Sequence, residues 1–240
     1  VDEQTQSRTL SDSVDISDHT KRLVEGFDKD IQDGELPLEI YNNEELYESE
    51  LDRVFARSWV FVGHESEVPD PGDYWLRYIG EDPFILVRDE SGTIRLLFDS
   101  CRHRGTKLCR TEKGNTSHFR CPYHGWTYKN TGELVGVSQQ SKVFKDIDKS
   151  EYPLHEAPNV ETYGGFIFAS LNENVPPLEE YFDDAKWYLD PHFKITEWEV
   201  VGEPHRWQVN IDWKTVTENT TTDNYHVPIG HKSATDIGIG

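Results

Sequence analysis

The sequence predicts an α+β fold: a small antiparallel β unit over residues 56–172, followed by the opening part of a larger α+β unit over residues 173–240. Two observations predict this class. Short apolar runs separated by Pro, Gly and Ser breakers fill the first region, as in antiparallel sheets. Apolar residues at helical spacing, with capping residues or Pro at their starts, occur on both sides of that region.

The first element is an acidic arm with helices over residues 1–55. The first 50 residues hold 15 Asp and Glu against 4 Lys and Arg, and residues 1–20 have few apolar side chains. This composition favours a flexible, solvated arm over residues 1–20, with an acidic coat suited to high salt as the alternative. Asn43 is placed to cap a helix near residues 44–57, where apolar residues recur at helical spacing.

The β unit is predicted from β-rich runs between turn residues. These runs are Trp59–Val62, Tyr74–Leu76, Phe84–Val87, Ile94–Phe98 and a single strand Tyr163–Ala169. An amphipathic helix from Leu178 to Leu189, introduced by two prolines, should follow. Strands near 195–210 and a helix from Asp212 towards His226 complete the predicted elements.

Composition limits the function classes. A net charge of −21 should repel nucleic acid and anionic membranes, and no apolar run has the length of a membrane span or signal peptide. A cytoplasmic protein is the expectation. Three cysteines, an odd number, argue against a disulfide framework. The chain starts at Val1 and contains no Met, so we expect a fragment. It also stops at Ile237–Gly240 with no terminating helix or strand indicated, so we expect it to be incomplete at its C-terminal end.

The first site motif is Cys101-x-His103, followed after seventeen residues by Cys121-x-x-His124. Each half offers one thiolate and one imidazole, and a [2Fe–2S] cluster takes two ligands on each iron, with histidines able to replace the thiolates of one iron. A zinc site is the alternative, since zinc also binds two Cys and two His. One residue between Cys101 and His103 is a short separation for two ligands of a single ion. We therefore predict the cluster, and we interpret Cys109, which lies outside both halves, as a packing residue.

These motifs resemble the Rieske domain of aromatic-ring-hydroxylating dioxygenases. The resemblance rests on Cys101–Gly105 and Cys121–Trp126, and extends to Phe55–Trp59 and Glu161–Gly165. It implies the large (alpha) subunit of a biphenyl or naphthalene type dioxygenase, with a Rieske domain over residues 56–172 and the start of a catalytic domain over 173–240. A Rieske electron carrier without oxygenase activity and a Rieske monooxygenase or demethylase stay open as alternatives.

The second site motif is Asp223-x-x-His226-x4-His231. On a helix, Asp223 and His226 would share a face, and Pro228 and Gly230 would end that helix and allow His231 to turn back. Two histidines and a carboxylate on one face of Fe(II) leave positions open for dioxygen and substrate. The spacing alone is a weak signal, because paired histidines near a helix end are common.

The same family carries such a segment after its Rieske domain. By this resemblance His226 and His231 are ligands of a mononuclear Fe(II), Asp223 bridges to a Rieske histidine of a neighbouring subunit, and Asn219 lies near the iron. The family's third ligand is an acidic residue farther along than Gly240. Thr220–Thr222 depart from the family's more apolar pattern, which puts the local helix in doubt.

The resemblance also implies partners. In the family, NADH electrons arrive through a reductase and usually a ferredoxin, the substrates are an aromatic compound and dioxygen, and the product is a cis-dihydrodiol. Subunits form a homotrimer, or an α3β3 assembly with a small subunit. Residues 101–129 contain seven Lys and Arg against one acidic residue. They are either an ordinary solvated loop region or an electropositive surface that attracts an acidic electron donor.

Overall fold

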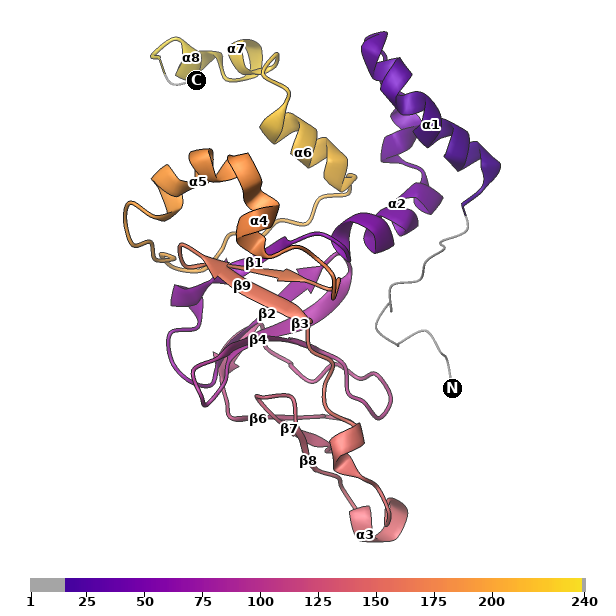
Figure 1. The fold of residues 1–240 in the computed structure, drawn as a ribbon, viewed down its shortest axis with the longest axis vertical. Helices are drawn as coiled ribbons and strands as arrows, with labels where there is room; N and C mark the ends of the chain where they lie inside the picture. The colour runs from indigo at the N-terminus through magenta and orange to yellow at the C-terminus, as the bar shows by residue number, and fades with distance from the viewer. Residues whose placement is uncertain (1–15, 239–240) are drawn as a thin grey trace. The chain divides into compact units, whose positions relative to one another are not determined.

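The computed structural model describes residues 16–238, which form two compact units. The first unit contains residues 50–204, and the second contains residues 16–49 and 205–238. Helices and antiparallel sheets occur in the chain (Figure 1), so the predicted α+β class is confirmed.

Three antiparallel sheets build the first unit. The first sheet has the order β1-β10-β9, with bounds Val60–His64, Phe166–Ser170 and Asn159–Tyr163. The second sheet has the order β4-β3-β2-β5, with bounds Ile94–Phe98, Asp82–Arg88, Asp73–Ile79 and Lys113–Asn115. The third sheet has the order β6-β7-β8, with bounds His118–Arg120, Thr127–Lys129 and Leu134–Gly136.

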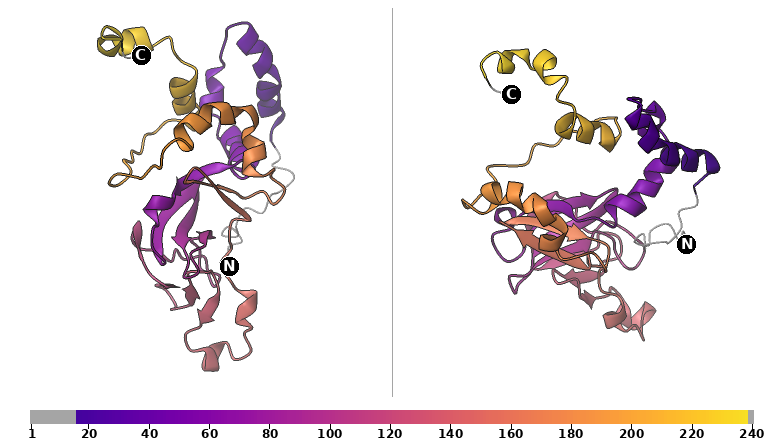
Figure 2. Two further views of the ribbon diagram at one scale, coloured as in Figure 1. Left: turned by 60° about the vertical axis from the view of Figure 1, so that its left-hand side comes forward. Right: turned by 45° about the horizontal axis from the view of Figure 1, so that its top comes forward.

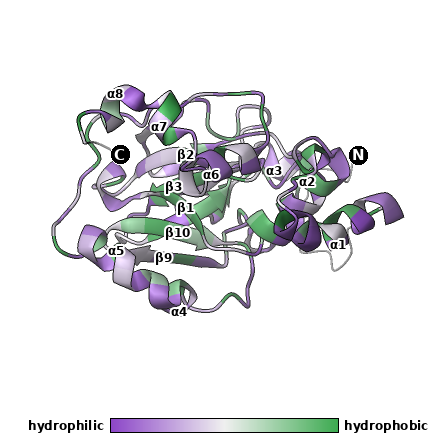
Figure 3. Cartoon of the chain, turned by 90° about the horizontal axis from the view of Figure 1, so that it is seen from above, coloured by the Kyte–Doolittle hydropathy of each residue, from purple (hydrophilic) through white to green (hydrophobic). Residues whose placement is uncertain are grey.

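The second sheet is buried on both faces, and strand β3 shows why. Its alternate residues Phe84 and Leu86 belong to an apolar core shared with β1 and β10, whose residues are predominantly apolar in Figure 3. The intervening residues Ile85 and Val87 belong to a second core, shared with the loops that carry Cys101 and Cys121. Successive side chains of a strand point to opposite faces, so one strand connects the framework of the unit to the candidate site.

One predicted strand proves to be a hairpin. The run Tyr163–Ala169 contains the end of β9, a turn at Gly164 and Gly165, and most of β10. Both glycines have positive φ (59° and 86°), where a side chain is strained. A Cβ on Gly165 would also lie 2.5 Å from Nε2 of His64. The prediction of a single strand was wrong because the Gly-Gly pair reverses the chain.

The predicted helix Leu178–Leu189 is interrupted. It consists of α4 (Leu178–Phe182), a 3-10 turn at Asp183–Ala185 and α5 (Lys186–Phe193). Asp183 has a φ of 42°, which an α-helix does not tolerate.

One helix of the first unit was not predicted. It is α3 (Gln140–Val143), which Figure 2 shows on the segment that projects beyond the third sheet.

The second unit is helical. It contains α1 (Asp18–Gln32), the start of α2 (Glu44–Glu50), α6 (Trp213–Thr221), α7 (Val227–Gly230) and α8 (Lys232–Thr235). A short turn of 3-10 helix lies at Leu38–Tyr41 in this unit, and two others lie in the first unit, at Glu65–Glu67 and Lys149–Glu151. A π-helical turn at Leu51–Phe55 continues α2. The predicted helix near 44–57 is therefore present.

Two predictions about the chain outside the sheets were wrong. The flexible arm predicted over residues 1–20 does not extend that far, since Ser17 caps α1 and Thr20 is buried; residues 1–15 lie outside the described part. The strands expected near 195–210 are absent from that segment. Apolar residues alternate with other residues at Trp207, Val209 and Ile211, at the end of this segment, as in a strand. These three side chains are exposed, and no strand among the described residues pairs with this part of the chain. No helix among residues 16–238 is both long and apolar enough to cross a membrane.

Candidate metal centres

The two halves of the first motif form loops with matching backbone hydrogen bonds. In the first loop the amide of Gly105 donates to the carbonyl of Cys101 (2.8 Å), and in the second the amide of Gly125 donates to the carbonyl of Cys121 (3.0 Å). Gly105 and Gly125 have positive φ values of 72° and 68°, which glycine adopts without strain. The same turn thus follows the second donor of each loop.

The loops bring the sulfur donors together in the core beneath the second sheet. Cys101 and Cys121 are 2% and 3% exposed, and Cys121 is a near neighbour that affects the titration of Cys101. Burial raises the pKa of the Cys101 thiol. None of the three cysteines forms a disulfide with another described residue, and Cys109 packs against the same core.

The imidazole donors form a second pair. The rings of His103 and His124 have centroids 4.7 Å apart. Burial, with contributions from His124 and Arg104, lowers the pKa of His103, which favours the neutral form that binds metals. The Nδ1 atom of His103 is buried and has no hydrogen-bonding partner in the described chain. A buried nitrogen without a partner is costly, and an iron ligated at this atom would remove the cost.

This donor set fits a [2Fe–2S] cluster. The structure groups sulfur with sulfur and imidazole with imidazole, and each iron of such a cluster can take one of these pairs. Within residues 16–238, no group of three or more His, Cys, Asp and Glu side chains is arranged to hold one metal ion. A tetrahedral zinc site needs its four ligands around one point, so the paired arrangement favours the cluster.

The second motif also brings its residues together, although differently from the prediction. The rings of His226 and His231 have centroids 5.2 Å apart, and Oδ2 of Asp223 lies 3.0 Å from Nδ1 of His226. That close approach lacks the geometry of a hydrogen bond. Asn219 lies in α6, the helix that precedes this group.

The helical arrangement predicted for Asp223 and His226 was wrong. Helix α6 ends at Thr221, and the Oδ1 atom of Asp223 accepts the backbone amides of Tyr225 (3.1 Å) and His226 (3.2 Å). This side-chain turn, not a helix face, places the carboxylate beside the imidazole. Pro228 does not break a helix either, since it lies in the first turn of α7, where its missing N–H costs nothing.

Comparison with known proteins agrees with the geometry. The Rieske [2Fe-2S] domain family matches residues 58–161. The alpha subunit of N,N-dimethyl phenylurea N-demethylase from Sphingobium sp. (strain YBL2) is 41% identical over 95% of this chain and 49% of its own length. The alpha subunit of benzene 1,2-dioxygenase from Pseudomonas putida is 42% identical over 82% of this chain and 44% of its own length.

The fold gives the same result. The structure of naphthalene 1,2-dioxygenase from Rhodococcus sp. bound to indole superimposes with a TM-score of 0.84 and 44% identity, over 92% of this chain and 51% of that chain. This chain belongs to the family of Rieske oxygenase alpha subunits. It spans about half the length of the relatives that it matches.

A residue of this Rieske oxygenase alpha subunit that the sequence analysis missed is Tyr128. Its hydroxyl lies 3.4 Å from Sγ of Cys101 and accepts the backbone amide of Arg102 (3.1 Å). Because that amide is already the donor, the single hydroxyl hydrogen of Tyr128 is available to the sulfur. Tyr128 is fully buried, and burial raises its pKa, so the hydroxyl keeps this hydrogen. Nothing in the motif spacing indicates the contact.

Substitution of Tyr128→Phe is expected to lower the reduction potential of the cluster. The hydroxyl stabilises the more negative reduced state by donating to a ligand sulfur, and hydrogen bonds to the sulfurs are a determinant of the potential. A hydrogen bond to a charged group contributes roughly 1.5 kcal/mol, which is about 60 mV for one electron. Potentiometric titration measures the shift. Tyr152→Phe, a hydroxyl removal in the same core, is the control and should leave the potential unchanged.

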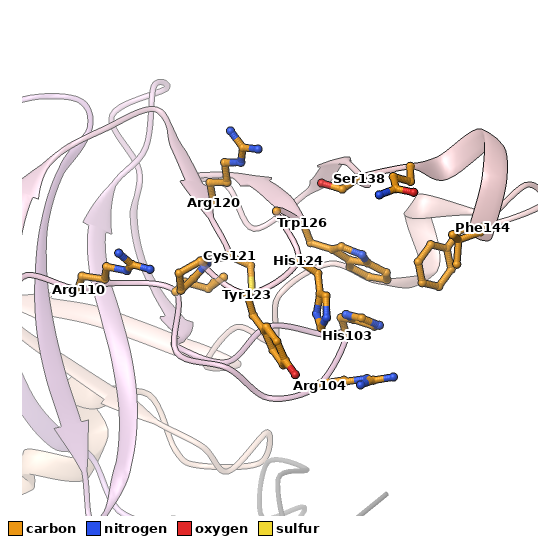
Figure 4. Close-up of a pocket in the computed structure, with 15 residues that line it drawn as sticks. His103, Arg104, Arg110, Arg120, Cys121, Tyr123, His124, Trp126, Ser138 and Phe144 are labelled. Atoms are coloured by element: carbon orange, nitrogen blue, oxygen red, sulfur yellow. The ribbon is translucent and has the colours of Figure 1, made fainter.

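A cavity of about 830 Å³ opens beside the imidazole pair and is drawn in Figure 4. Its wall includes both histidines and the three arginines Arg104, Arg110 and Arg120. All three arginines are exposed, and none forms an ion pair with the described residues. The basic region predicted from the sequence therefore borders the candidate cluster site.

Proposed function

We propose that this chain is part of the terminal oxygenase component of an aromatic-ring-hydroxylating dioxygenase, which catalyses cis-dihydroxylation with dioxygen. Cys101, His103, Cys121 and His124 hold the Rieske [2Fe–2S] cluster, and His226 and His231 hold a mononuclear Fe(II). When bound, the cluster supplies single electrons and the Fe(II) supplies open positions for dioxygen and substrate. In this proposal residues 1–55 are an N-terminal arm with helices, residues 56–172 are the Rieske domain, and residues 173–240 are the start of the catalytic domain.

The observation that carries the proposal is the grouping of donors in the first centre. Two buried sulfurs and two neighbouring imidazoles lie on loops with the same turn. The partnerless buried Nδ1 of His103 supports ligation at that atom.

In the second centre, Asp223 orients the ligand imidazole. Its carboxylate lies 3.0 Å from Nδ1 of His226, without hydrogen-bond geometry, so Nε2 of the same ring is left to face the iron. With iron bound, the Nδ1–H group would donate to this carboxylate, as in carboxylate–histidine–metal arrangements. We further propose that Asp223 connects to a Rieske histidine of a neighbouring subunit, in a homotrimer or an α3β3 assembly. Asn219 lies near the iron in this proposal, and an acidic residue beyond Gly240 completes the ligand set.

Metal analysis tests the proposal. The full-length protein should contain three irons and two acid-labile sulfides per subunit, with a Rieske spectrum. Two irons with the same spectrum would favour a simple electron carrier, and zinc in place of iron would contradict both functions.

A Rieske monooxygenase or demethylase is the second candidate. The observation that favours it is the 41% identity, over 95% of this chain, to the alpha subunit of an N-demethylase. Product analysis separates the two reactions. With arenes, the dioxygenase proposal expects cis-dihydrodiols; with N-methylated aromatic ureas, the demethylase alternative expects formaldehyde and the demethylated urea.

The electron donor is proposed to be an acidic ferredoxin or reductase that receives electrons from NADH. Removing two positive charges at the cavity, in the double variant Arg110→Gln and Arg120→Gln, should slow cluster reduction about tenfold at low salt, because electrostatic steering raises association rates. Stopped-flow reduction by the donor measures this rate. The difference from wild type should disappear at high ionic strength, where exposed charges are screened.

Charge removal from residues that do not line the cavity is the matched control. The double variant Arg53→Gln and Arg57→Gln loses the same charge from exposed positions of the same unit, outside the cavity wall. It should reduce at the wild-type rate. Equal slowing in both double variants, or rates independent of salt, would contradict docking at this cavity.

A further inference from the structure

Among the ring contacts of His103 and His124, the one closest to parallel is between His103 and Trp126. The proposed function assigns no role to Trp126. Its indole lies parallel to the ring of His103, with centroids 5.0 Å apart and an angle of 10° between the planes. Trp126 is 2% exposed, so the indole covers one side of His103 and shields that side from water. A flat aromatic face in contact with an imidazole restricts the rotation of the imidazole about its last side-chain bond.

Other aromatic side chains fix the indole in turn. Phe144 contacts the edges of both His103 and Trp126, with centroids 5.7 Å away in each case. Tyr152 contacts Trp126 edge-on at 5.9 Å. The indole is therefore held on several sides, whereas hydrogen bonding does not hold it, because its Nε1 atom is buried without a partner in the described chain. Packing alone determines the plane of the indole.

The two imidazoles of the pair differ in this respect. His124 has its closest aromatic contact with Tyr123, whose ring is 62% exposed. An exposed ring has fewer packing contacts to hold it, so it restricts its neighbour less than a buried ring does. Only His103 combines a buried parallel stack with a buried Nδ1 atom that has no partner within the described chain.

We propose that Trp126 is a positioning residue, which holds the imidazole of His103 so that Nδ1 is directed at the cluster and water is excluded from that side. The proposal rests on the proposed function, because it assumes that His103 is a cluster ligand. It extends that function by assigning the orientation of one of the two imidazoles to a side chain that binds no metal.

The test uses the cluster-loaded full-length protein and the variants Trp126→Leu and Trp126→Phe. Pulsed EPR of the reduced cluster measures the nitrogen couplings of the two histidine ligands. Trp126→Leu, which removes the flat face, should shift one coupling and leave the other at its wild-type value. Trp126→Phe keeps an aromatic face and should leave both couplings near their wild-type values.

The reduction potential gives a second readout. Loss of the indole should admit water, which stabilises the more negatively charged reduced cluster. The ratio of reduced to oxidised cluster at a fixed potential should rise about threefold in Trp126→Leu, or about 28 mV at 59 mV per tenfold change for one electron.

Tyr74→Leu is the matched control. It removes an aromatic ring from the same core, and the ring of Tyr74 contacts Phe119 but neither His103 nor Trp126 among the described residues. It should lower stability without moving either coupling. If Trp126→Leu does not fold, Trp126→Met, whose unbranched side chain adapts to the space without a flat face, takes its place with the same expected result.

The outcomes are distinct. Unchanged couplings in a folded variant that lacks the flat face, or equal changes in Tyr74→Leu, would overturn the positioning role while the cluster itself remains. Absence of acid-labile sulfide from the wild-type protein would instead refute the proposed function on which the inference rests.

Discussion

Substitution of Cys121→Ala is expected to eliminate the cluster from this protein. A [2Fe–2S] cluster needs four ligands, and the methyl group of alanine cannot ligate iron. Because metal binding contributes directly to the folding of small metal-bound units, the two loops should also lose their order. We expect no acid-labile sulfide, loss of the visible Rieske absorption, and a free energy of unfolding lowered by more than about 4 kcal/mol.

Cys109→Ala is the control for Cys121→Ala. Cys109 packs against the same core as Cys121 and is a free thiol, but it lies in neither donor pair. Its replacement removes one buried sulfur and should cost only about 1 kcal/mol of cavity and transfer energy. Sulfide content should remain that of the wild type. Loss of the cluster in Cys109→Ala, or its retention in Cys121→Ala, would show that the ligands are assigned wrongly.

The second large effect is expected from His226→Ala. Loss of a residue that only supports a metal ligand lowers metal affinity by about 10- to 100-fold. His226 is proposed as a direct ligand, so its removal should lower the affinity of the mononuclear site for iron by at least about 100-fold. The full-length protein should then contain two irons per subunit instead of three, and oxygenation should stop. The Rieske spectrum should persist, because the four cluster donors are untouched. Iron and sulfide analysis, together with product formation, measure these results.

His205→Ala serves as the comparison for His226→Ala. His205 belongs to the same unit and is exposed, and its ring contact is with Trp207. It should retain three irons and wild-type activity. Simultaneous loss of the Rieske spectrum and of activity in His226→Ala would indicate that the two centres do not have the separate ligand sets that we propose.

The predicted strands succeeded where a run has its own turn signals. Phe84–Val87 and Ile94–Phe98 lie inside β3 and β4, which pair across a Ser-Gly-Thr turn. The four short strands β5, β6, β7 and β8 were missed, since three residues give too little periodicity. Asn130-Thr131-Gly132, between Tyr128 and Leu134, is a turn signal that could have revealed the β7–β8 hairpin.

The sequence by itself determined the α+β class and which residues are candidates for the centres. Donor type and spacing within a few residues are local properties, so the residue pattern is sufficient to propose Cys101, His103, Cys121 and His124. The spacing of Asp223, His226 and His231 is a weaker signal, and the family resemblance was needed to propose them. Apolar periodicity likewise indicated the α+β class, since it needs no knowledge of distant contacts.

Only the tertiary structure decided how those residues meet. The contact of Tyr128 with Cys101 joins residues 27 positions apart, and the stack of Trp126 on His103 joins the two loops. Neither leaves a periodic trace in the sequence. The Asp223 turn and the break at Asp183 depend on backbone angles that the residue pattern did not reveal. Packing between segments that are distant in the sequence sets the first two features, and local backbone conformation sets the last two.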